Sequence, residues 1–308
     1  MMNTERKNSL AAAGFLLPSF FGFAIFSIFP MIISLCISLT NWNGLTALTL
    51  FGDPGAFFRE YFTGLRNFSA IFSSAEIYQT LGNNIYFTVL YLPLMLLTSI
   101  SAALILNKNL HGVSFFRVVY YIPVLSSWVA GAMIWKWVLS PDYGVISAAL
   151  AIVGIKGPAW LQNPLWAMPG VVLASVWKDM GFYGLMFLAG LKSIDPGYYE
   201  AAEIDGAGKG RQLWHITLPL LSPVIFFVVI ISMIGAFQLF PQVMIMMSPD
   251  TAGPQGSTMV IMERIYSYAF RYFEMGYASA ISWILFALIF ILTFIQMKFQ
   301  DKWVTYDT

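Results

Sequence analysis

Residues 200–219 read EAAEIDGAGKGRQLWHITLP, and this short polar stretch determines how the rest of the chain is interpreted. Four acidic residues, Asp195, Glu200, Glu203 and Asp205, lie within it or just before it, in a chain that is otherwise mostly apolar. Carboxylates are costly to bury without partners, so such a segment needs water or a protein surface around it.

The composition indicates a membrane protein. Of 308 residues, 58% are hydrophobic and only 10% are charged, and the mean hydropathy is +0.72. These values lie far outside the range of soluble globular domains. The formal net charge is +1 and no Lys/Arg-rich run is present, so we expect no nucleic-acid partner. Cys36 is the only cysteine, and His111 and His215 are far apart, so no metal site is expected.

Six apolar stretches are long enough to cross the bilayer, which takes about 20 helical residues. They predict an all-α polytopic membrane protein in which residues 1–308 form one domain. Because the number is even, both termini lie on the same side. The predicted spans are Leu10–Leu39, Leu81–Leu106, Val118–Leu139, Leu165–Gly190, Pro223–Met247 and Tyr277–Met297.

The distribution of Lys and Arg predicts the orientation. The two tails and the loops 107–117 and 191–222 hold nine of these residues, whereas the longer loops 41–80, 140–164 and 248–276 hold five. Cytoplasmic loops carry the excess of positive charge. We therefore expect both termini and the loop 191–222 in the cytoplasm, and the loop 41–80 outside.

The loop 191–222 predicts two helices with a sharp break between them. Asp195 and Pro196 are a typical N-cap and first helical residue, so a helix should begin there and run to about Ile204. Gly206 provides the left-handed conformation that ends helices. A second helix then begins near residues 208–211 and enters the membrane at Pro219. On these features alone, a simple amphipathic surface helix remains an alternative to a docking element.

The spacing in this loop resembles a known signature. Glu200-Ala201-Ala202, three residues, Gly206, nine residues and Ile216-x-Leu218-Pro219 match the EAA---G---------I-LP motif of binding-protein-dependent ABC importer permeases of the MetI-like fold at every fixed position. Further stretches are similar to the sugar-uptake branch, typified by the first permease of maltose and glycerol-phosphate systems. These are SLTNWNG (38–44), FFRVVYYIPVLSS (115–127), AWLQNP (159–164), LAGLKSID (188–195) and GYASAISWILF (276–286). The chain departs from that branch at MSPDTAGPQGST (247–258), where the branch has a shorter turn.

The resemblance implies a permease subunit that moves a sugar or oligosaccharide from an external binding protein into the cytoplasm. It implies residence in a bacterial or archaeal cytoplasmic membrane, and pairing with a homologous second permease, two ABC ATPase subunits and the solute-binding protein. The loop would be the coupling helix that docks on an ATPase. The residues implied in ATPase coupling are Glu200, Ala201, Ala202, Asp205 and Gly206.

The chain has no nucleotide-binding motif of its own. The glycine-rich run GAGKGRQ (206–212) lacks the G-x-x-x-x-G-K-[ST] spacing and the Ser/Thr that would meet Mg²⁺. We therefore expect no enzyme activity and no cofactor in this chain, with ATP and Mg²⁺ bound by the partner ATPase.

A polar cluster in the fourth and fifth spans is the predicted substrate path. Lys178 and Asp179 lie near mid-membrane, where charged residues normally face a bundle interior or a wet cavity. A structural salt bridge to another span or to the second permease is the alternative for this pair. An aromatic surface with amide and hydroxyl partners suits a sugar. The family resemblance implies that the sugar contacts cluster on the fourth and fifth spans, including the region after the tryptophan of span four. With this, the predicted path residues are Trp177, Lys178, Asp179, Gly181, Tyr183, Ser232, Gln238 and Gln242.

Other functions are weighed against this one. A related solute such as glycerol-phosphate would use the same motifs, and an amino-acid permease belongs to the same class but resembles a shorter chain. A stand-alone secondary transporter would need its own driving-ion site, and the spans hold few ionisable groups. An intramembrane enzyme would need a constellation such as Ser/Lys, paired aspartates or H-E-x-x-H, and none is convincingly placed in the sequence.

Overall fold

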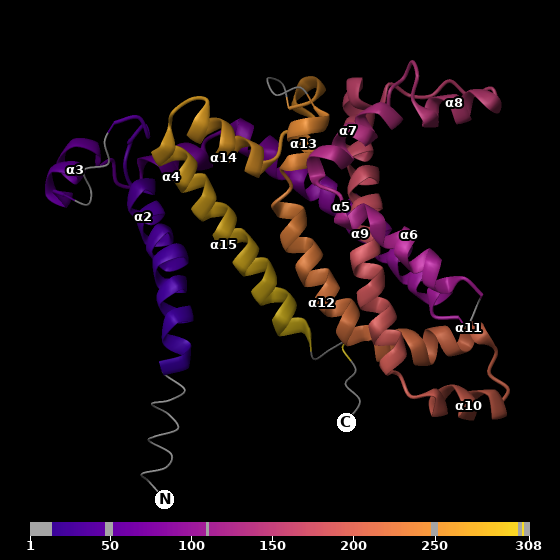
Figure 1. Ribbon diagram of the computed structural model, residues 1–308. Helices are drawn as coiled ribbons and strands as arrows, with labels where there is room; N and C mark the ends of the chain where they lie inside the picture. The colour runs from indigo at the N-terminus through magenta and orange to yellow at the C-terminus, as the bar shows by residue number, and fades with distance from the viewer. Residues whose placement is uncertain (1–13, 47–51, 109–110, 248–251, 301–303, 305–308) are drawn as a thin grey trace, which may run out of the picture. The chain divides into compact units, whose positions relative to one another are not determined.

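A computed structural model describes residues 14–46, 52–108, 111–247, 252–300 and 304 (Figure 1). Within these residues the secondary structure is helical, and the only strand-type pairing is a single antiparallel bridge between Thr40 and Phe62. The predicted all-α class is confirmed. The elements are η1 Ala24–Ile28, α2 Phe29–Ser38, α3 Pro54–Tyr61, α4 Arg66–Phe72, α5 Ala75–Leu106, α6 Val113–Leu125, α7 Trp128–Val138, α8 Val145–Ile152, η3 Trp160–Gln162, α9 Pro164–Ser193, α10 Pro196–Ile204, α11 Lys209–Gln212, η4 Leu213–Thr217, α12 Leu218–Phe237, α13 Pro241–Met246, η5 Pro254–Gly256, α14 Ile261–Phe270 and α15 Met275–Phe299.

Five described helices are long and apolar enough to span a membrane, or six if one bent pair counts as a span. The five are Gly14–Ser38, Ala75–Leu106, Pro164–Ser193, Lys209–Phe237 and Met275–Phe299. The N-terminal tail and the start of the first predicted span, at residues 10–13, lie outside the described residues. So do most of the residues after α15.

The third predicted span is not one straight helix. α6 ends at Leu125, α7 begins at Trp128, and the two helices are bent by 101°. Ser127 explains the restart, because its side chain accepts a hydrogen bond from the N–H of Ala130 at 3.2 Å and so caps α7. Periodicity alone did not predict this break.

The fifth predicted span is displaced toward the loop and interrupted. Its helix is continuous with the second loop helix, which starts at Lys209 as predicted, but it ends at Phe237 instead of continuing to Met247. A short non-helical segment then precedes α13, which starts at Pro241. Proline has no backbone N–H and restricts the residue before it, so a helix stops here readily.

The described residues form two compact units, one drawn from the ranges 1–74 and 265–284 and the other from the ranges 75–264 and 285–308. The first unit has a small core of Ile37, Trp42 and Phe57. Its chain segments approach closely at Gly276, whose N–H donates to the carbonyl of Trp42 at 3.0 Å. A Cβ at this position would lie 1.9 Å from the carbonyl oxygen of Thr40, so only glycine fits.

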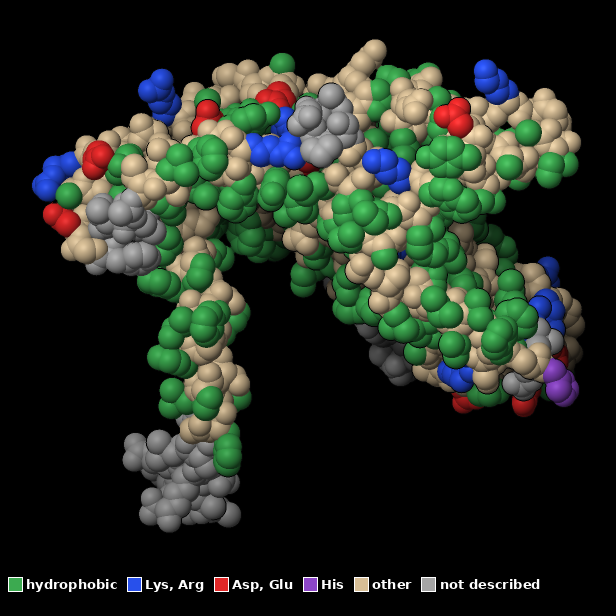
Figure 2. Space-filling view, turned by 45° about the horizontal axis from the view of Figure 1, so that its top comes forward, with side chains coloured by type: hydrophobic (Ala, Val, Ile, Leu, Met, Phe, Trp, Pro, Cys, Tyr) green, Lys and Arg blue, Asp and Glu red, His purple; other side chains and the backbone are tan. Residues whose placement is uncertain are grey.

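The second unit is built around α9. Helices α5, α6, α7, α12 and α13 all contact α9, and the contact with α5 is the most extensive. The core is apolar, with Met95, Phe187, Leu221 and Val228 fully buried or nearly so. Figure 2 shows mostly hydrophobic and uncharged surface along the right-hand part of the view, with most of the charged side chains toward its ends. This distribution fits helices surrounded by lipid.

Polar side chains at the start of α5 hold the segment between α13 and α14 in the same unit. The side-chain amide of Asn83 donates to the carbonyls of Gly256 and Met259, both at 2.9 Å. Asn84 accepts from the N–H of Ile261 at 2.9 Å. These bonds fix the described part of the segment where the sequence departs from the sugar branch; residues 248–251 of that stretch lie outside the described residues.

Arg264 follows this set of hydrogen bonds in the chain. Its guanidinium is nearly buried and donates to Glu263 at 2.6 and 2.7 Å and to Glu76 at 2.8 Å. Burial alone would lower the pKa of Arg264, but its hydrogen bonds to Glu263 and Glu76 outweigh that effect and raise the pKa above its ordinary value. Arg264 therefore stays charged and joins α14 to the first turn of α5.

Candidate functional site

A cavity of about 340 Å³ lies within the second unit, where both interrupted spans meet α5 and α9. Non-helical backbone at membrane depth is tolerated where it is buried in protein or lines a cavity. Both helix breaks, between α6 and α7 and between α12 and α13, adjoin the 340 Å³ cavity. Its lining comes from α5, α7, α9, α12 and α13. The lining residues are Phe87, Tyr91, Trp128, Ser175, Asp179, Tyr183, Gly235, Ala236, Gln238, Pro241 and Gln242.

Two polar atoms in this lining are buried without a partner. The hydroxyl oxygen of Ser175 and the amide oxygen Oε1 of Gln242 have no hydrogen bond with the described part of the chain. Buried polar groups are nearly always hydrogen-bonded, and an unsatisfied one costs about 1–3 kcal/mol. The cavity therefore holds hydrogen-bonding capacity that the described chain leaves unused.

A carboxylate and an aromatic pair complete the cavity. Oδ2 of Asp179 accepts a hydrogen bond from the hydroxyl of Tyr91 at 2.7 Å. Tyr91 is stacked on Phe87, with ring centroids 5.1 Å apart and planes 14° from parallel. Because Tyr91 occupies one lone pair of Asp179, the carboxylate keeps further acceptor capacity for a ligand.

The face of α9 determines which predicted residues line the cavity. Ser175, Asp179 and Tyr183 are spaced by four and so lie along one side of the helix. Of the eight predicted path residues, the structure brings together Asp179, Tyr183, Gln238 and Gln242 around the cavity. Their contact with substrate stays a prediction.

The other four predicted path residues lie elsewhere. Trp177 packs edge-on against Trp135, with ring centroids 6.0 Å apart. Gly181 lies against α6, where a Cβ would meet the carbonyl oxygen of Tyr120 at 2.5 Å. The hydroxyl of Ser232 donates within its own helix to Val228 at 2.6 Å.

Lys178 also points away from the cavity lining. Its ammonium donates to the carbonyls of Pro123, Val124 and Ser126. Neither Lys178 nor Asp179 forms an ion pair with any residue that the structure describes. The predicted alternative of a salt bridge to another span is therefore not seen within this chain.

Four lining residues that carry chemistry were missed from the sequence: Phe87, Tyr91, Trp128 and Ser175. Ser175 had a signal, because it precedes Asp179 by four residues and a polar stripe with this period marks one helix face. Trp128 had none, since its position depends on the bend between α6 and α7.

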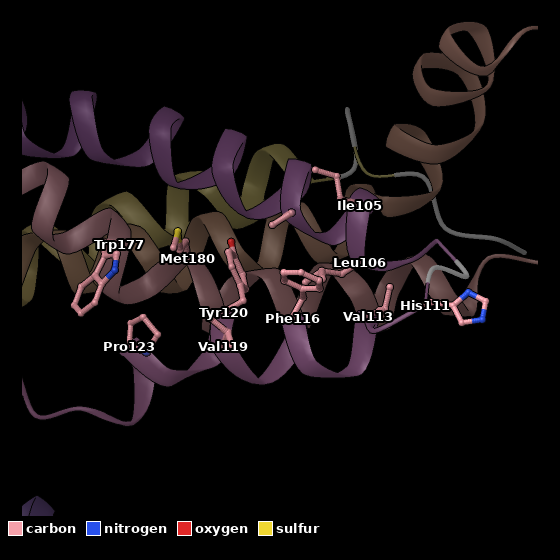
Figure 3. A pocket seen from close by; sticks show the side chains of 11 residues that line it. Ile105, Leu106, His111, Val113, Phe116, Val119, Tyr120, Pro123, Trp177 and Met180 are labelled. Atoms are coloured by element: carbon pink, nitrogen blue, oxygen red, sulfur yellow. The ribbon is translucent and has the colours of Figure 1, made fainter. Parts of the chain in front are cut away.

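A second, larger hollow of about 540 Å³ lies between α5, α6 and α9 (Figure 3). Its lining is almost entirely apolar and includes Ile105, Val113, Phe116 and Val119, with His111 at one end. Such a surface offers few hydrogen bonds to a polar solute. The smaller cavity is therefore the better candidate for a substrate site.

The loop between α9 and α12 has the predicted helix and break. α10 runs from Pro196 to Ile204, and the side chain of Asp195 caps it by accepting from the N–H of Gly197 at 2.8 Å. The N–H of Ala207 donates to Ala202 at 2.8 Å and that of Gly206 to Glu203 at 3.1 Å. This pair of bonds is the Schellman motif, and Gly206 supplies the left-handed residue with φ +75°.

The coupling residues predicted in this loop are accessible. Glu200, Ala201, Asp205 and Gly206 are exposed and Ala202 is half-buried. Ile204 is 87% exposed and offers apolar area to a partner. Opposite this surface, the hydroxyl of Tyr199 lies 3.1 Å from that of Thr217 and ties α10 to the base of the next span. The role of these residues in ATPase contact stays a prediction.

Among the described residues no group of three or more His, Cys, Asp or Glu could hold a metal ion.

Residues 68–306 match the family described as "Binding-protein-dependent transport system inner membrane component". The chain belongs to this family. This inner membrane component is thus a multi-pass permease of an ABC transporter, as the loop signature implies.

Curated relatives cover almost the full length of the permease. It is 36% identical over 306 residues to the probable ABC transporter permease protein YesP of Bacillus subtilis, with 98% of this chain and 94% of the relative covered. It is 32% identical over 286 residues to the lactose transport system permease protein LacF of Rhizobium radiobacter, covering 92% and 91%.

Solved structures show the same fold. The permease superposes on a chain of a bacterial ABC transporter involved in the import of the acidic polysaccharide alginate with a TM-score of 0.80 and 23% identity, covering 98% of both chains. The MetI-like arrangement expected from the sequence is therefore confirmed.

Proposed function

We propose that this chain is a permease subunit of an ATP-driven importer that carries a sugar or oligosaccharide, and that the 340 Å³ cavity forms part of the path. The observation that supports it best is the pair of unsatisfied atoms in the cavity wall, Ser175 Oγ and Gln242 Oε1. A sugar hydroxyl both donates and accepts, so it can satisfy an amide oxygen, a serine hydroxyl and the carboxylate of Asp179 alike.

The aromatic lining fits the same class of solute. Trp128, Phe87 and Tyr91 bring flat apolar surfaces to the cavity, against which the C–H faces of a pyranose ring can pack. Polar groups that fix orientation and aromatic groups that supply contact area are the usual composition of a small-molecule site.

The charges of the cavity distinguish a sugar from glycerol-phosphate. Among the described residues that line it there is one carboxylate, Asp179, and no Lys or Arg. Phosphate groups are recognised by cationic side chains and backbone N–H groups, and a carboxylate repels them. A solute with neutral hydroxyls is therefore the better fit.

The names of the relatives agree with this class. Beside the lactose permease, the chain is 33% identical to the trehalose/maltose transport system permease protein MalF of Thermococcus litoralis and 32% identical to the sulfoquinovosyl glycerol transport system permease protein SmoG of Agrobacterium fabrum. A glycerol-3-phosphate permease, UgpA of Yersinia pestis, is also 32% identical, so the cavity chemistry rather than the identity favours a sugar.

The proposed assembly rests on the missing nucleotide-binding motif and on the exposed surface of α10. It has no nucleotide-binding motif, whereas α10 presents an accessible surface with Ile204 and Glu200. We place this loop in the cytoplasm on a pair of ABC ATPase subunits that bind ATP and Mg²⁺. A homologous second permease and an external solute-binding protein complete the importer, and both termini are cytoplasmic.

ATP-driven uptake in proteoliposomes tests the proposal. The complete importer with its loaded binding protein is expected to accumulate sugar only when ATP is enclosed with the ATPase subunits. Gln242→Leu and Ser175→Ala should each lower uptake while basal ATP hydrolysis and assembly persist. Ser232→Ala is the matched control, because this hydroxyl is also buried but bonds within its own helix.

Three results would contradict the proposal. Sugar uptake by this chain in the absence of ATPase subunits would indicate a secondary transporter instead. Wild-type uptake in both cavity variants would remove the cavity from the path. Preferential uptake of glycerol-phosphate over sugars would contradict the assigned solute class.

A further inference from the structure

Lys178 is a charged residue in the middle of α9, and its side chain is 6% exposed in the structure. Its ammonium donates three hydrogen bonds, to the carbonyl oxygens of Pro123 at 2.9 Å, Val124 at 3.2 Å and Ser126 at 2.6 Å. An ammonium has three N–H donors, so each can be satisfied here. The partner of this buried charge is thus backbone at the end of another helix.

The break in the span leaves these carbonyls without the donors of a continuous helix, although that of Pro123 also accepts from the N–H of Ser126 at 3.2 Å and from the Ser126 hydroxyl at 2.7 Å. In a continuous helix the N–H groups four residues later, on Ser127, Trp128 and Ala130, would bond to Pro123, Val124 and Ser126. The 101° bend between α6 and α7 removes that arrangement. The N–H of Ala130 donates instead to the side chain of Ser127.

The positive charge of Lys178 matches the electrostatic character of the C-terminal end of α6. Carbonyl groups at the C-terminal end of a helix carry partial negative charge and have no intrahelical donors. Within a membrane such groups are costly to leave without partners. The ammonium of Lys178, reaching in from α9, donates to three of these carbonyls at once.

The same lysine lies next to the cavity wall. Its ammonium is 5.6 Å from the centroid of the Trp128 ring, the first residue of α7 and a lining residue. Asp179, its neighbour in sequence and about 100° further around α9, lines the cavity. One segment of α9 therefore contacts both the helix break and the cavity.

We propose that Lys178 is a positioning residue: it holds the break between α6 and α7 in its bent form and so keeps Trp128 in the wall of the cavity. Its effect on transport rests on the proposed function, whereas its effect on the bend does not. The bent form competes with a straight one in which the backbone would satisfy its own carbonyls and Lys178 would lose its partners. Lys178 therefore acts through Trp128 and does not contact the solute.

The test measures the bend directly. Cys36, the only cysteine, is replaced by serine, and spin labels are placed at Val118 on α6 and Met133 on α7, both exposed. Distances between the labels are recorded by pulsed electron paramagnetic resonance in the assembled importer. Lys178→Met, which keeps an unbranched side chain one atom shorter but removes all three donors, is expected to lengthen and broaden the distribution. Lys178→Arg, which keeps the donors, should preserve it.

Lys192→Met is the matched control, because Lys192 lies on the same helix but is exposed. It should leave the distribution unchanged. In the unlabelled importer, Lys178→Met should lower sugar uptake at least about tenfold, which corresponds to about 1.4 kcal/mol, and Lys178→Arg should recover most of it. If Lys178→Met does not assemble, Lys178→Gln, with two donors on a shorter neutral chain, is measured in its place.

A wild-type distance distribution in Lys178→Met or Lys178→Gln would overturn the proposal, as would equal broadening in Lys192→Met. Broadening with normal uptake would overturn the link to Trp128 and transport. The distance measurement requires no transported solute, so it decides the role of Lys178 even if the cavity proves to carry no sugar.

Discussion

The hydroxyl of Tyr91 on α5 donates a hydrogen bond of 2.7 Å to the carboxylate of Asp179 on α9. This bond joins the two most extensively packed helices of the second unit at the wall of the proposed sugar cavity. A carboxylate held by one donor keeps its position and still has acceptor sites free for a solute.

Asp179→Asn tests the charge of that carboxylate. The amide keeps its shape and can still accept from Tyr91, but hydrogen bonds to an ionised acceptor are roughly twice as strong as neutral ones. We expect the KM for sugar uptake to rise about tenfold, equivalent to about 1.4 kcal/mol, with assembly unchanged. Uptake kinetics in proteoliposomes with saturating loaded binding protein measure it. Tyr91→Phe, which leaves the charge in place, should have the smaller effect; the reverse order would contradict a direct contact between Asp179 and solute.

Gly206→Val should uncouple ATP hydrolysis from uptake. Nothing lies within 4 Å of a Cβ placed on Gly206, so the obstacle is its φ of +75°, a conformation that β-branched residues strongly disfavour. The helix break would be lost and α10 would change direction. Stimulation of ATPase activity by loaded binding protein is the measurement.

Gly208→Val is the control for this loop. Gly208 also has open space around it, but its φ is −67°, which any residue adopts. It should retain stimulation, and Gly206→Asn should retain most of it because asparagine tolerates the left-handed region. Equal loss in the Gly206→Val and Gly208→Val variants would show that the backbone conformation is not the cause.

Gly181→Ala should destabilise the assembled protein. Its Cβ would lie 2.5 Å from the carbonyl oxygen of Tyr120, which is backbone and cannot rotate away, so α6 and α9 would have to separate. Such overpacking typically costs about 1–3 kcal/mol. Thermal unfolding in detergent checks it. Gly82→Ala, where a Cβ on α5 meets nothing within 4 Å, should be neutral or stabilising; a comparable loss there would contradict the packing argument.

The loop after α10 should respond to acid through Glu203. Its hydrogen bond and ion pair with Lys209 lower the pKa of this exposed carboxyl below its ordinary value. Because the pKa of Glu203 is lower in the folded state, its ionised form stabilises the loop at pH values above the unfolded pKa of about 4.3. This stabilisation is lost as the pH falls through the folded-state pKa. Lys209→Met should return the pKa of Glu203 to its ordinary value in an NMR titration. An unchanged pKa would show that the pair does not form in solution.

The sequence predicted the loop more accurately than the spans. Asp195, Pro196 and Gly206 act through local backbone chemistry, and caps and left-handed glycines can be recognised from neighbouring residues alone. The bounds of α10 and its break were therefore predicted correctly. The apolar runs, by contrast, predicted how many times the chain could cross a membrane but not where a helix bends.

The lining of the cavity, too, could be predicted only in part from the sequence. The spacing of Ser175, Asp179 and Tyr183 could have separated them from Trp177, Lys178 and Gly181 as two faces of one helix. Which of the two faces the cavity depends on α5 and α13 packing beside α9, and tertiary contacts of this kind leave no periodic signal in the sequence. Trp128 and Gln238 reach the cavity only because two spans are interrupted.

The helix Gly14–Ser38 is apolar along its length, and only 6% of its most apolar stretch is buried in the structure. Its hydrophobic residues lie on all sides, with Phe15, Phe20 and Phe26 each more than 60% exposed. A helix with apolar side chains on every side has no polar face that would determine its rotation about its own axis or the choice of its neighbours. Its rotation in the assembled importer is therefore determined by shape complementarity with its surroundings. Substitutions along it should be tolerated according to side-chain volume and not according to the pattern of polar and apolar positions.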